Sequence, residues 1–124
     1  MATVSLSKAD FEQTITDNQI VLVDFWASWC GPCRMFAPIF DKAAAANPDI
    51  VFGKVDTEAE RELAAAAQIT SIPTLMAFKD GSLVFAQPGA LPAQALEQLI
   101  AAVRDLDMDK VRAEQAAQQE RRSA

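Results

Sequence analysis

Residues 20–33 read IVLVDFWASWCGPC. From residue 20 to residue 26, apolar side chains occupy both alternating sets of positions, and Asp24 is the one polar exception. A run of this kind is typical of a β-strand that is covered on both faces. The Gly-Pro pair between Cys30 and Cys33 suits the first turn of a helix, because proline needs no amide hydrogen there. The stretch therefore predicts a buried strand that leads directly into a helix carrying two cysteines.

Strands and helices alternate along the rest of the chain. From the hydrophobic spacing we expect further strands at residues 4–6, 50–55, 74–79 and 82–87, and helices at residues 7–17, 30–47, 57–67 and 92–106. Asp80-Gly81 is a strong turn signal that makes the last two strands an antiparallel hairpin. Thr57 and Glu60 have the spacing of a capping box at the start of the third helix. The order predicts an α/β fold with a central mixed β-sheet of about five strands, flanked on both faces by about four helices.

The chain of 124 residues is long enough for one hydrophobic core and too short for two. We therefore expect a single domain over residues 1–106. Residues 107–124 are rich in Ala, Gln, Glu and Arg, and they form a polar C-terminal extension. Their composition leaves both a marginal helix and a frayed tail open.

The chain carries a formal net charge of −6, from 17 acidic and 11 basic residues. Its field repels nucleic-acid phosphates and anionic lipids, so neither nucleic acid nor a membrane is expected as a partner. The N-terminal residues show no basic cluster followed by an apolar stretch, and we expect a cytoplasmic protein. Histidine is absent, which excludes hydrolases that depend on a Ser-His or Cys-His pair.

The two cysteines lie three residues apart at the expected start of a helix, where they can close a disulfide. Unpaired amide N–H groups and the helix dipole favour the thiolate of Cys30, which makes it the expected exposed nucleophile. Cys33 lies further into the helix, shielded, where it can resolve a mixed disulfide. A histidine between the cysteines would favour an oxidant, and its absence favours a reductant. We therefore expect a redox-active disulfide between Cys30 and Cys33.

Two other interpretations of such a pair are half of a zinc site and two inert core residues. Zinc needs four ligands, and the chain has neither a third cysteine nor a histidine, so we expect no metal site within one chain. A zinc site shared between two chains stays open. Inert core cysteines are disfavoured, because the intervening Gly-Pro favours an exposed turn.

The segment from Val21 to Cys33 resembles the active-site region of the thioredoxin family. Further segments resemble that family in the same order, namely KVD at 54–56, SIPT at 71–74, FKDG at 78–81 and GAL at 89–91. The likeness covers about residues 2–106. It implies the thioredoxin fold and a protein-disulfide reductase that binds no cofactor and acts on disulfide-containing target proteins. It also implies recycling by an NADPH-dependent thioredoxin reductase, and we expect a monomer.

The resemblance implies that Asp24 is a buried carboxylate beneath Cys33 and accepts its proton. The residues themselves agree in part, since Asp24 shares a strand face with Leu22 and Trp26, where burial should raise its pKa. The pattern alone also allows an aspartate at a strand end, bonded to backbone or solvent. Lys54 is implied to approach Asp24 and modulate it, although a lysine at a strand end is more often a surface group.

A docking surface beside the dithiol follows from the same resemblance. It comprises Trp29, Ile72, Pro73, Gly89 and Ala90, for which ordinary core or turn packing is the alternative. From the residues alone the Ile72–Pro73 bond would be trans, as most such bonds are. The resemblance implies a cis bond instead, with the Ile72 backbone free to pair with a substrate strand. Gly31 and Pro32 complete the active-site motif together with Trp29 and the cysteines.

Three departures from the family pattern concern the choice of partner. Pro88 stands in place of an aliphatic residue and lacks an amide N–H, Thr70 and Ser71 carry no charge beside the expected substrate groove, and the C-terminal extension is unusual. These departures leave two other functions open. One is a dedicated reductant for a single partner enzyme. The other is a thioredoxin-like binding or chaperone module in which redox chemistry is incidental.

Overall fold

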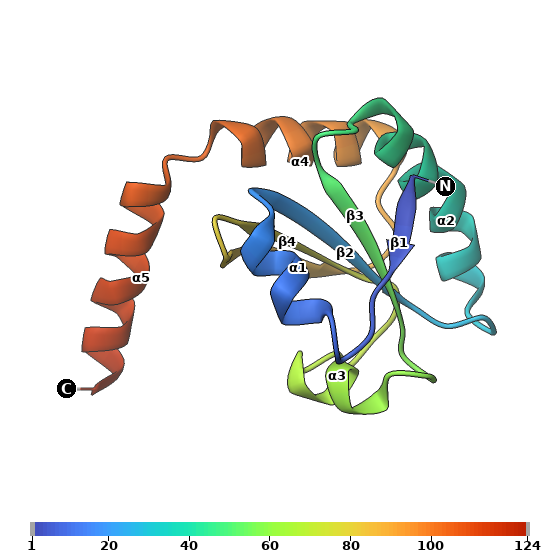
Figure 1. Ribbon diagram of the computed structural model, residues 1–124, viewed down its shortest axis with the longest axis horizontal. Helices are drawn as coiled ribbons and strands as arrows, with labels where there is room; N and C mark the ends of the chain where they lie inside the picture. The colour runs from blue at the N-terminus through green and yellow to red at the C-terminus, as the bar shows by residue number, and fades with distance from the viewer. Residues whose placement is uncertain (1, 124) are drawn as a thin grey trace.

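A five-stranded β-sheet forms the centre of the computed structural model, which describes residues 2–123 (Figure 1). Along the chain the elements are β1 (Thr3–Ser5), α1 (Phe11–Asp17), β2 (Ile20–Trp26), α2 (Gly31–Ala46), β3 (Val51–Asp56), α3 (Arg61–Ala66), β4 (Thr74–Lys79), β5 (Ser82–Pro88), α4 (Ala93–Asp105) and α5 (Met108–Ser123). The strands lie in the order β1-β3-β2-β4-β5. The first three of these are parallel, and β4 and β5 each run antiparallel to the strand before them in that order. The predicted mixed α/β sheet is confirmed.

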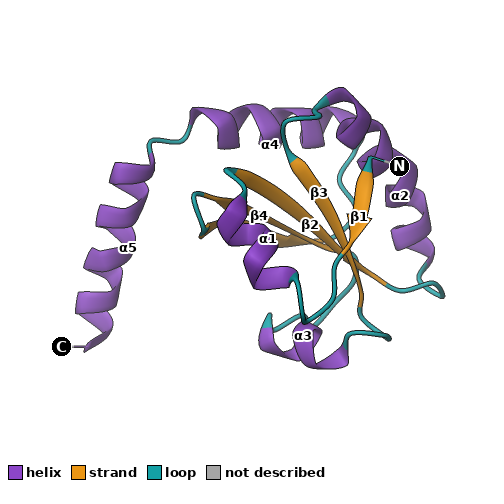
Figure 2. Ribbon diagram, viewed as in Figure 1, coloured by secondary structure: helices purple, strands orange, loops and turns teal. Residues whose placement is uncertain are grey.

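Two hydrophobic cores pack against opposite faces of the sheet, and β2 contributes to both. Leu22 belongs to the core formed with α2 and α4, whereas Val23 and Phe25 belong to the core formed with α1. Figure 2 shows the helices on the two faces of the sheet. By the same alternation Asp24 lies on the α2 face, in the middle of a strand that is buried from Ile20 to Phe25. None of the helices over residues 2–123 has the length and apolar character needed to cross a membrane.

The start of α3 differs from the prediction. The helix begins at Arg61, and its N-cap residue Glu60 makes no capping hydrogen bond with its side chain. Thr57 donates instead to the backbone carbonyl of Trp26 through both its hydroxyl (3.0 Å) and its amide (2.9 Å). The capping-box prediction was therefore wrong, because the Thr57 hydroxyl bonds to the end of β2 instead of capping the start of α3.

Residues 108–123 form a separate helix rather than a continuation of α4. The chain leaves α4 at Asp105, and the carboxylate of Asp107 accepts hydrogen bonds from the amides of Asp109 (3.0 Å) and Lys110 (3.3 Å). These bonds satisfy amides at the start of a helix that would otherwise lack partners. The side chain of Met108 is buried, so the first turn of α5 is anchored to the body of the protein.

A buried lysine holds the C-terminal end of α4. Lys79, at the end of β4, is only 5% exposed. Its ammonium donates three hydrogen bonds to backbone carbonyls, those of Val103 (2.8 Å), Arg104 (2.8 Å) and Leu106 (3.0 Å). These carbonyls lie where a helix runs out of its own amide donors, and a cation is favourable at that end of the helix dipole. Lys79 therefore fixes α4, and with it the start of α5, to the sheet.

Replacement of Lys79 by methionine should destabilise the fold. The apolar side chain fills the same space but leaves three carbonyls without donors, so we expect a loss of about 3 kcal/mol. Urea unfolding of the oxidised protein measures this loss. Lys110→Met, at an exposed position of α5, is the matched control and should change the free energy of unfolding little. Equal effects of the two substitutions would contradict the proposed capping role.

Candidate active site

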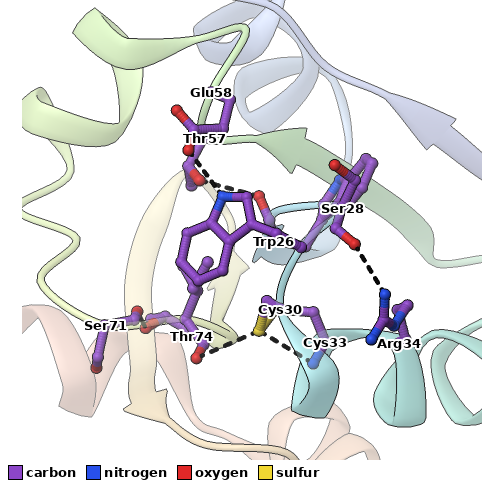
Figure 3. Close-up of a disulfide and its surroundings, with 11 residues drawn as sticks. Trp26, Ser28, Cys30, Cys33, Arg34, Thr57, Glu58, Ser71 and Thr74 are labelled. Carbon is purple, nitrogen blue, oxygen red and sulfur yellow. Dashed lines mark hydrogen bonds between the residues drawn. A yellow bond between two sulfur atoms is a disulfide. The ribbon is translucent and has the colours of Figure 1, made fainter.

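A disulfide between Cys30 and Cys33 closes the first turn of α2 (Figure 3). Cys30 is the N-cap residue of the helix, with extended backbone angles, and the Cα atoms of the two cysteines are 5.2 Å apart. Gly31 and Pro32 fill the first two helical positions, where proline loses no hydrogen bond because these amides have no partner within the helix. The Gly-Pro spacer thus allows the helix to begin between the two cysteines.

The sulfur of Cys30 takes the place of a capping oxygen. The amide N–H of Cys33 donates to Cys30 Sγ over 3.2 Å, and the amide of Arg34 donates to the Cys30 carbonyl over 3.2 Å. The positive end of the helix dipole adds to this bond. After reduction, both effects stabilise negative charge on this sulfur. Cys33 lies inside the first turn of α2, so its own sulfur is not at the N-cap position of the helix.

Both cysteines are nearly covered in this oxidised state. Cys30 is 4% exposed and Cys33 is 3% exposed. The expectation that Cys30 would be exposed was therefore wrong for the disulfide form. The cause is the packing around the pair, since Ala27, Trp26 and Ile72 lie against it. The roles of the two cysteines must therefore be distinguished by their place at the helix terminus and not by their exposure.

The loop before β4 lies directly against the disulfide. Sγ of Cys30 is 3.7 Å from the carbonyl oxygen of Ile72, and the Ile72–Pro73 bond is cis, the form that the resemblance implied. Two hydrogen bonds hold the loop, one from the hydroxyl of Thr74 to the carbonyl of Ser71 (2.6 Å) and one from the amide of Gly89 to the carbonyl of Pro73 (2.7 Å). The loop is therefore held in place beside the reactive sulfur.

Most of the expected docking residues come together around the disulfide. Trp29 is 65% exposed, and it lines a shallow hollow together with Ser71 and Ile72. Gly89 reaches this region through its bond to Pro73, and Ala90 follows it as an exposed residue.

The turn between β3 and α3 supplies site residues that the sequence did not reveal. The indole N–H of Trp29 donates to Oε1 of Glu58 over 2.8 Å (Figure 3 labels Glu58 and Thr57). The carboxylate of Asp56 accepts hydrogen bonds from the amides of Glu58 (2.9 Å) and Ala59 (3.3 Å). These two bonds hold the turn between β3 and α3 in shape. Together with the bonds of Thr57 to Trp26, these contacts hold the segment that precedes Cys30. No local pattern signals a contact between residues so far apart in the chain.

Asp24 is completely buried, and neither of its carboxylate oxygens has a hydrogen-bond partner among the described residues. Burial raises the pKa of Asp24 to about 7. The positive charge of Lys54 opposes this rise, and the negative charge of Asp41 on α2 adds to it. The alternative of an aspartate bonded to backbone or solvent at a strand end is therefore wrong. A carboxyl group with such a pKa can exchange protons near neutral pH.

Lys54 lies beside Asp24 on the neighbouring strand. The two residues are in register in the parallel pairing of β2 with β3. The side chain of Lys54 is half-buried, with its ammonium 5.3 Å from the centre of the Trp26 ring. This is within the range of a cation–π interaction, which holds the ammonium near the strand end. The residue thus lies where its charge reaches Asp24.

A redox-active type of cysteine pair at a helix N-terminus, beside a cis-proline loop and directly after a strand that carries a buried acid, defines a protein that exchanges disulfides. Comparisons with known proteins agree with this class. Residues 2–102 match the family model described as Thioredoxin. A Streptomyces coelicolor protein named "Putative thioredoxin 2" is 61% identical over 118 residues, which is 95% of this chain and 88% of that protein. A thioredoxin of Alicyclobacillus acidocaldarius is 43% identical over 82% of this chain and 98% of its own length.

Solved structures give the same result. A thioredoxin from Plasmodium falciparum is 39% identical with a TM-score of 0.74, over 81% of this chain and 97% of its own. A thioredoxin mutant from Halobacterium salinarum is 32% identical with a TM-score of 0.77, over 85% of this chain and 92% of its own. The chain belongs to the thioredoxin family. It is a protein dithiol-disulfide oxidoreductase with Cys30 and Cys33 as its redox pair.

Residues 2–123 contain no group of three or more Cys, Asp or Glu side chains arranged to hold a metal ion. The two sulfur atoms of Cys30 and Cys33 carry out the redox chemistry of the site themselves.

The stability of the oxidised protein should depend on pH through Asp24. Its carboxyl holds a proton more tightly in the folded state than in the unfolded chain, so stability is lost as pH rises from about 4 to about 7. Asp24→Asn removes this charge. We expect the variant to gain about 3 kcal/mol relative to the parent between pH 5 and pH 8.

Urea unfolding of both proteins at the two pH values gives this difference directly. Asp41→Asn, at an exposed position of α2, is the matched control and should show a much smaller change. A difference between parent and Asp24→Asn that stays constant with pH would show that Asp24 is not held as a protonated buried acid.

Proposed function

We propose that this protein is a general reductant of target-protein disulfides in which Cys30 attacks and Cys33 releases the product. The observation that carries this assignment is the hydrogen bond from the Cys33 amide to Cys30 Sγ at the N-terminus of α2. It stabilises charge on one sulfur of the pair only. The thiolate is the attacking form of a cysteine, so the sulfur that carries charge most readily reacts first.

The electrons and protons balance over two exchange steps. The Cys30 thiolate attacks one sulfur of a target disulfide, forms a mixed disulfide and releases the other target sulfur as a thiolate. Cys33 then loses its proton and attacks Cys30 Sγ, which breaks the mixed disulfide and frees the second target thiolate. Two electrons pass from the dithiol to the target, and Cys30 and Cys33 end as the disulfide seen here.

In the second step Asp24 is the proposed proton acceptor for Cys33. Its pKa of about 7 lets the carboxylate take up a proton and lose it again near neutral pH. Lys54 is the proposed modulator, since its charge opposes the effect of burial on Asp24. Asp24→Asn should therefore slow the release step more than the attack step.

Target proteins are proposed to dock on the surface around the disulfide. Trp29, Ile72, Pro73, Gly89 and Ala90 would form its rim, next to the covered sulfur atoms. This role is supported by the exposure of Trp29 and by the hydrogen bonds that hold the loop of Ile72 and Pro73. An extended segment of the target would pair with the Ile72 backbone.

The wider setting is proposed from the family. Recycling of the oxidised protein would fall to an NADPH-dependent thioredoxin reductase, a separate flavoprotein, so no cofactor would be bound by this chain. The acidic net charge of −6 supports protein partners rather than nucleic acids or anionic membranes. We propose a monomer that acts in the cytoplasm.

A dedicated reductant for one partner enzyme is the second candidate. Thr70, Ser71 and Pro88 line the same hollow beside β5, and they offer neither charge nor, at Pro88, an amide donor. A docking surface that lacks charged groups and one amide donor in this hollow would bind fewer kinds of target protein, which supports a single partner enzyme.

Substitution of the resolving cysteine tests the assignment. Cys33→Ser stops the reaction at the mixed disulfide, so we expect target proteins to stay covalently bound until a thiol is added. Capture from a cell extract, with release by dithiothreitol and mass spectrometry, shows how many targets there are. Many targets support a general reductant, and a single target supports the dedicated one.

Cys30→Ser is the matched variant, with the same change at the other end of the pair. It should capture no partner covalently and lose disulfide reduction. Covalent capture by Cys30→Ser but not by Cys33→Ser would reverse the two roles. Retention of full partner binding by Cys30→Ser without any covalent product in Cys33→Ser would favour a binding module.

A further inference from the structure

The docking hollow, which is lined by Trp29, Arg61 and Ile72 among others, begins beside the reactive sulfur. Trp29 directly precedes Cys30, and the carbonyl oxygen of Ile72 is 3.7 Å from Cys30 Sγ. The hollow has a volume of about 370 Å³, and small or uncharged side chains form most of its wall. Among residues 2–123, Arg61 is the only charged residue that lines it. The docking hollow is therefore an uncharged surface with one cation.

The acidic residues near Arg61 line a different hollow. Glu58, Glu60 and Glu62 lie in the wall of a second hollow, which they share with Lys8 and with the other side of Arg61. Glu62 forms an ion pair with Lys8, and Glu60 accepts a hydrogen bond from the Lys8 amide over 2.8 Å. None of the three acids lines the docking hollow. An acidic group that enters the docking hollow would therefore meet the cation without meeting an acidic side chain in the same wall.

The side chain of Arg61 is available to an incoming partner. It is 81% exposed, and it lies 3.5 Å from Oε2 of Glu58, three residues earlier in the chain. An ion pair of this length between exposed side chains contributes little. The other oxygen of Glu58 accepts the indole N–H of Trp29 over 2.8 Å, so Glu58 is held by a stronger contact than the one it makes with Arg61. The guanidinium group thus keeps most of its N–H donors for a new acceptor.

We propose that Arg61 is a specificity-determining residue, which selects target proteins that carry an acidic side chain close to the reacting cysteine. The inference rests on the proposed function, in which an extended segment of the target pairs with the Ile72 backbone. Such a segment advances by about 3.3 Å per residue, so the side chains next to its cysteine enter the docking hollow. A carboxylate there accepts a pair of hydrogen bonds from the guanidinium of Arg61.

The charge of the whole protein makes this single cation selective. The net charge of −6 repels acidic segments over most of the surface. A cation at the point where the target docks compensates for this repulsion only when the acidic side chain is correctly placed. Electrostatic complementarity of this kind affects the choice of partner more than the total affinity.

Peptide disulfides test the selection. Each substrate is a short peptide with one cysteine, joined to a second copy of itself by a disulfide. A single glutamate stands at one of the positions that flank the cysteine, and a matched peptide carries glutamine at that position. Mass spectrometry of the released peptide thiol gives the second-order rate constant with the reduced protein. The parent, Arg61→Gln and Arg61→Glu are compared, and Arg121→Gln, at an exposed position of α5, is the matched control for the change in net charge.

The ratio of the glutamate rate to the glutamine rate removes the effect of the glutamate on the peptide cysteine itself. Dividing the ratio of the parent by that of a variant isolates the interaction with Arg61. For at least one glutamate position we expect this quotient to be about threefold for Arg61→Gln at low salt and to fall toward one at high salt. Arg61→Glu should reverse the preference and favour a peptide with lysine at the same position. Arg121→Gln should give a quotient of one.

Three results would overturn the inference. The first is a quotient of one for Arg61→Gln at every glutamate position. The second is an equal quotient for Arg121→Gln, which would assign the effect to net charge. The third is a quotient that does not fall with salt, which would assign it to the shape of the side chain.

Reduction of hydroxyethyl disulfide separates this inference from the function on which it rests. This small substrate has no charge and no flanking residues, so it reports on the dithiol alone, and every variant should reduce it at the rate of the parent. A parent protein that cannot reduce it would overturn the reductase function and this inference with it. Normal reduction by all variants, together with any of the three results above, would overturn the role of Arg61 alone.

Discussion

The hydrogen bond from the amide of Cys33 to the sulfur of Cys30 is the contact on which the chemistry of this protein depends. It exists because β2 is held in the centre of the sheet and ends at the point where α2 begins, so that Cys30 falls on the N-cap position. Two cysteines elsewhere in a helix would have their amides engaged in the helix itself and would be alike. At this terminus they differ, since one sulfur receives an amide donor and the dipole of the helix, and the other does not.

A buried acid near neutral pKa accompanies this arrangement. Asp24 occupies a position in the core strand where an apolar side chain would pack without cost, and it has no hydrogen-bond partner among residues 2–123. Such a group destabilises the fold at the pH where it ionises. Its presence within an otherwise apolar strand supports the proposed part in proton transfer. Lys54 reduces the cost by placing a positive charge on the adjacent strand.

The local sequence was sufficient to predict β2, the helix after it and the β4–β5 hairpin, because hydrophobic spacing and the Asp80-Gly81 turn act over a few residues. Features that depend on contacts between distant segments could not be predicted in this way. Glu58, in the turn before α3, accepts a hydrogen bond from Trp29, which follows β2. Lys79, at the end of β4, caps α4, from which it is separated in the chain by β5. Ile72 covers the sulfur of Cys30, which the turn between the cysteines alone would leave exposed. Asp24 lies between these cases, since the strand pattern allowed both a buried aspartate and one at a strand end, and its proposed role came from the family resemblance alone.

The central claim is that one of the two sulfur atoms carries charge at neutral pH, and the rate of alkylation of each thiol in the reduced protein tests it most directly. Iodoacetamide labelling over a range of pH, with each cysteine resolved by mass spectrometry, gives the two rates. The account predicts that Cys30 reacts at neutral pH about tenfold faster than Cys33 or more, with little further gain as the pH rises. Two thiols that react equally slowly at neutral pH, and accelerate together only where ordinary cysteines ionise, would contradict it.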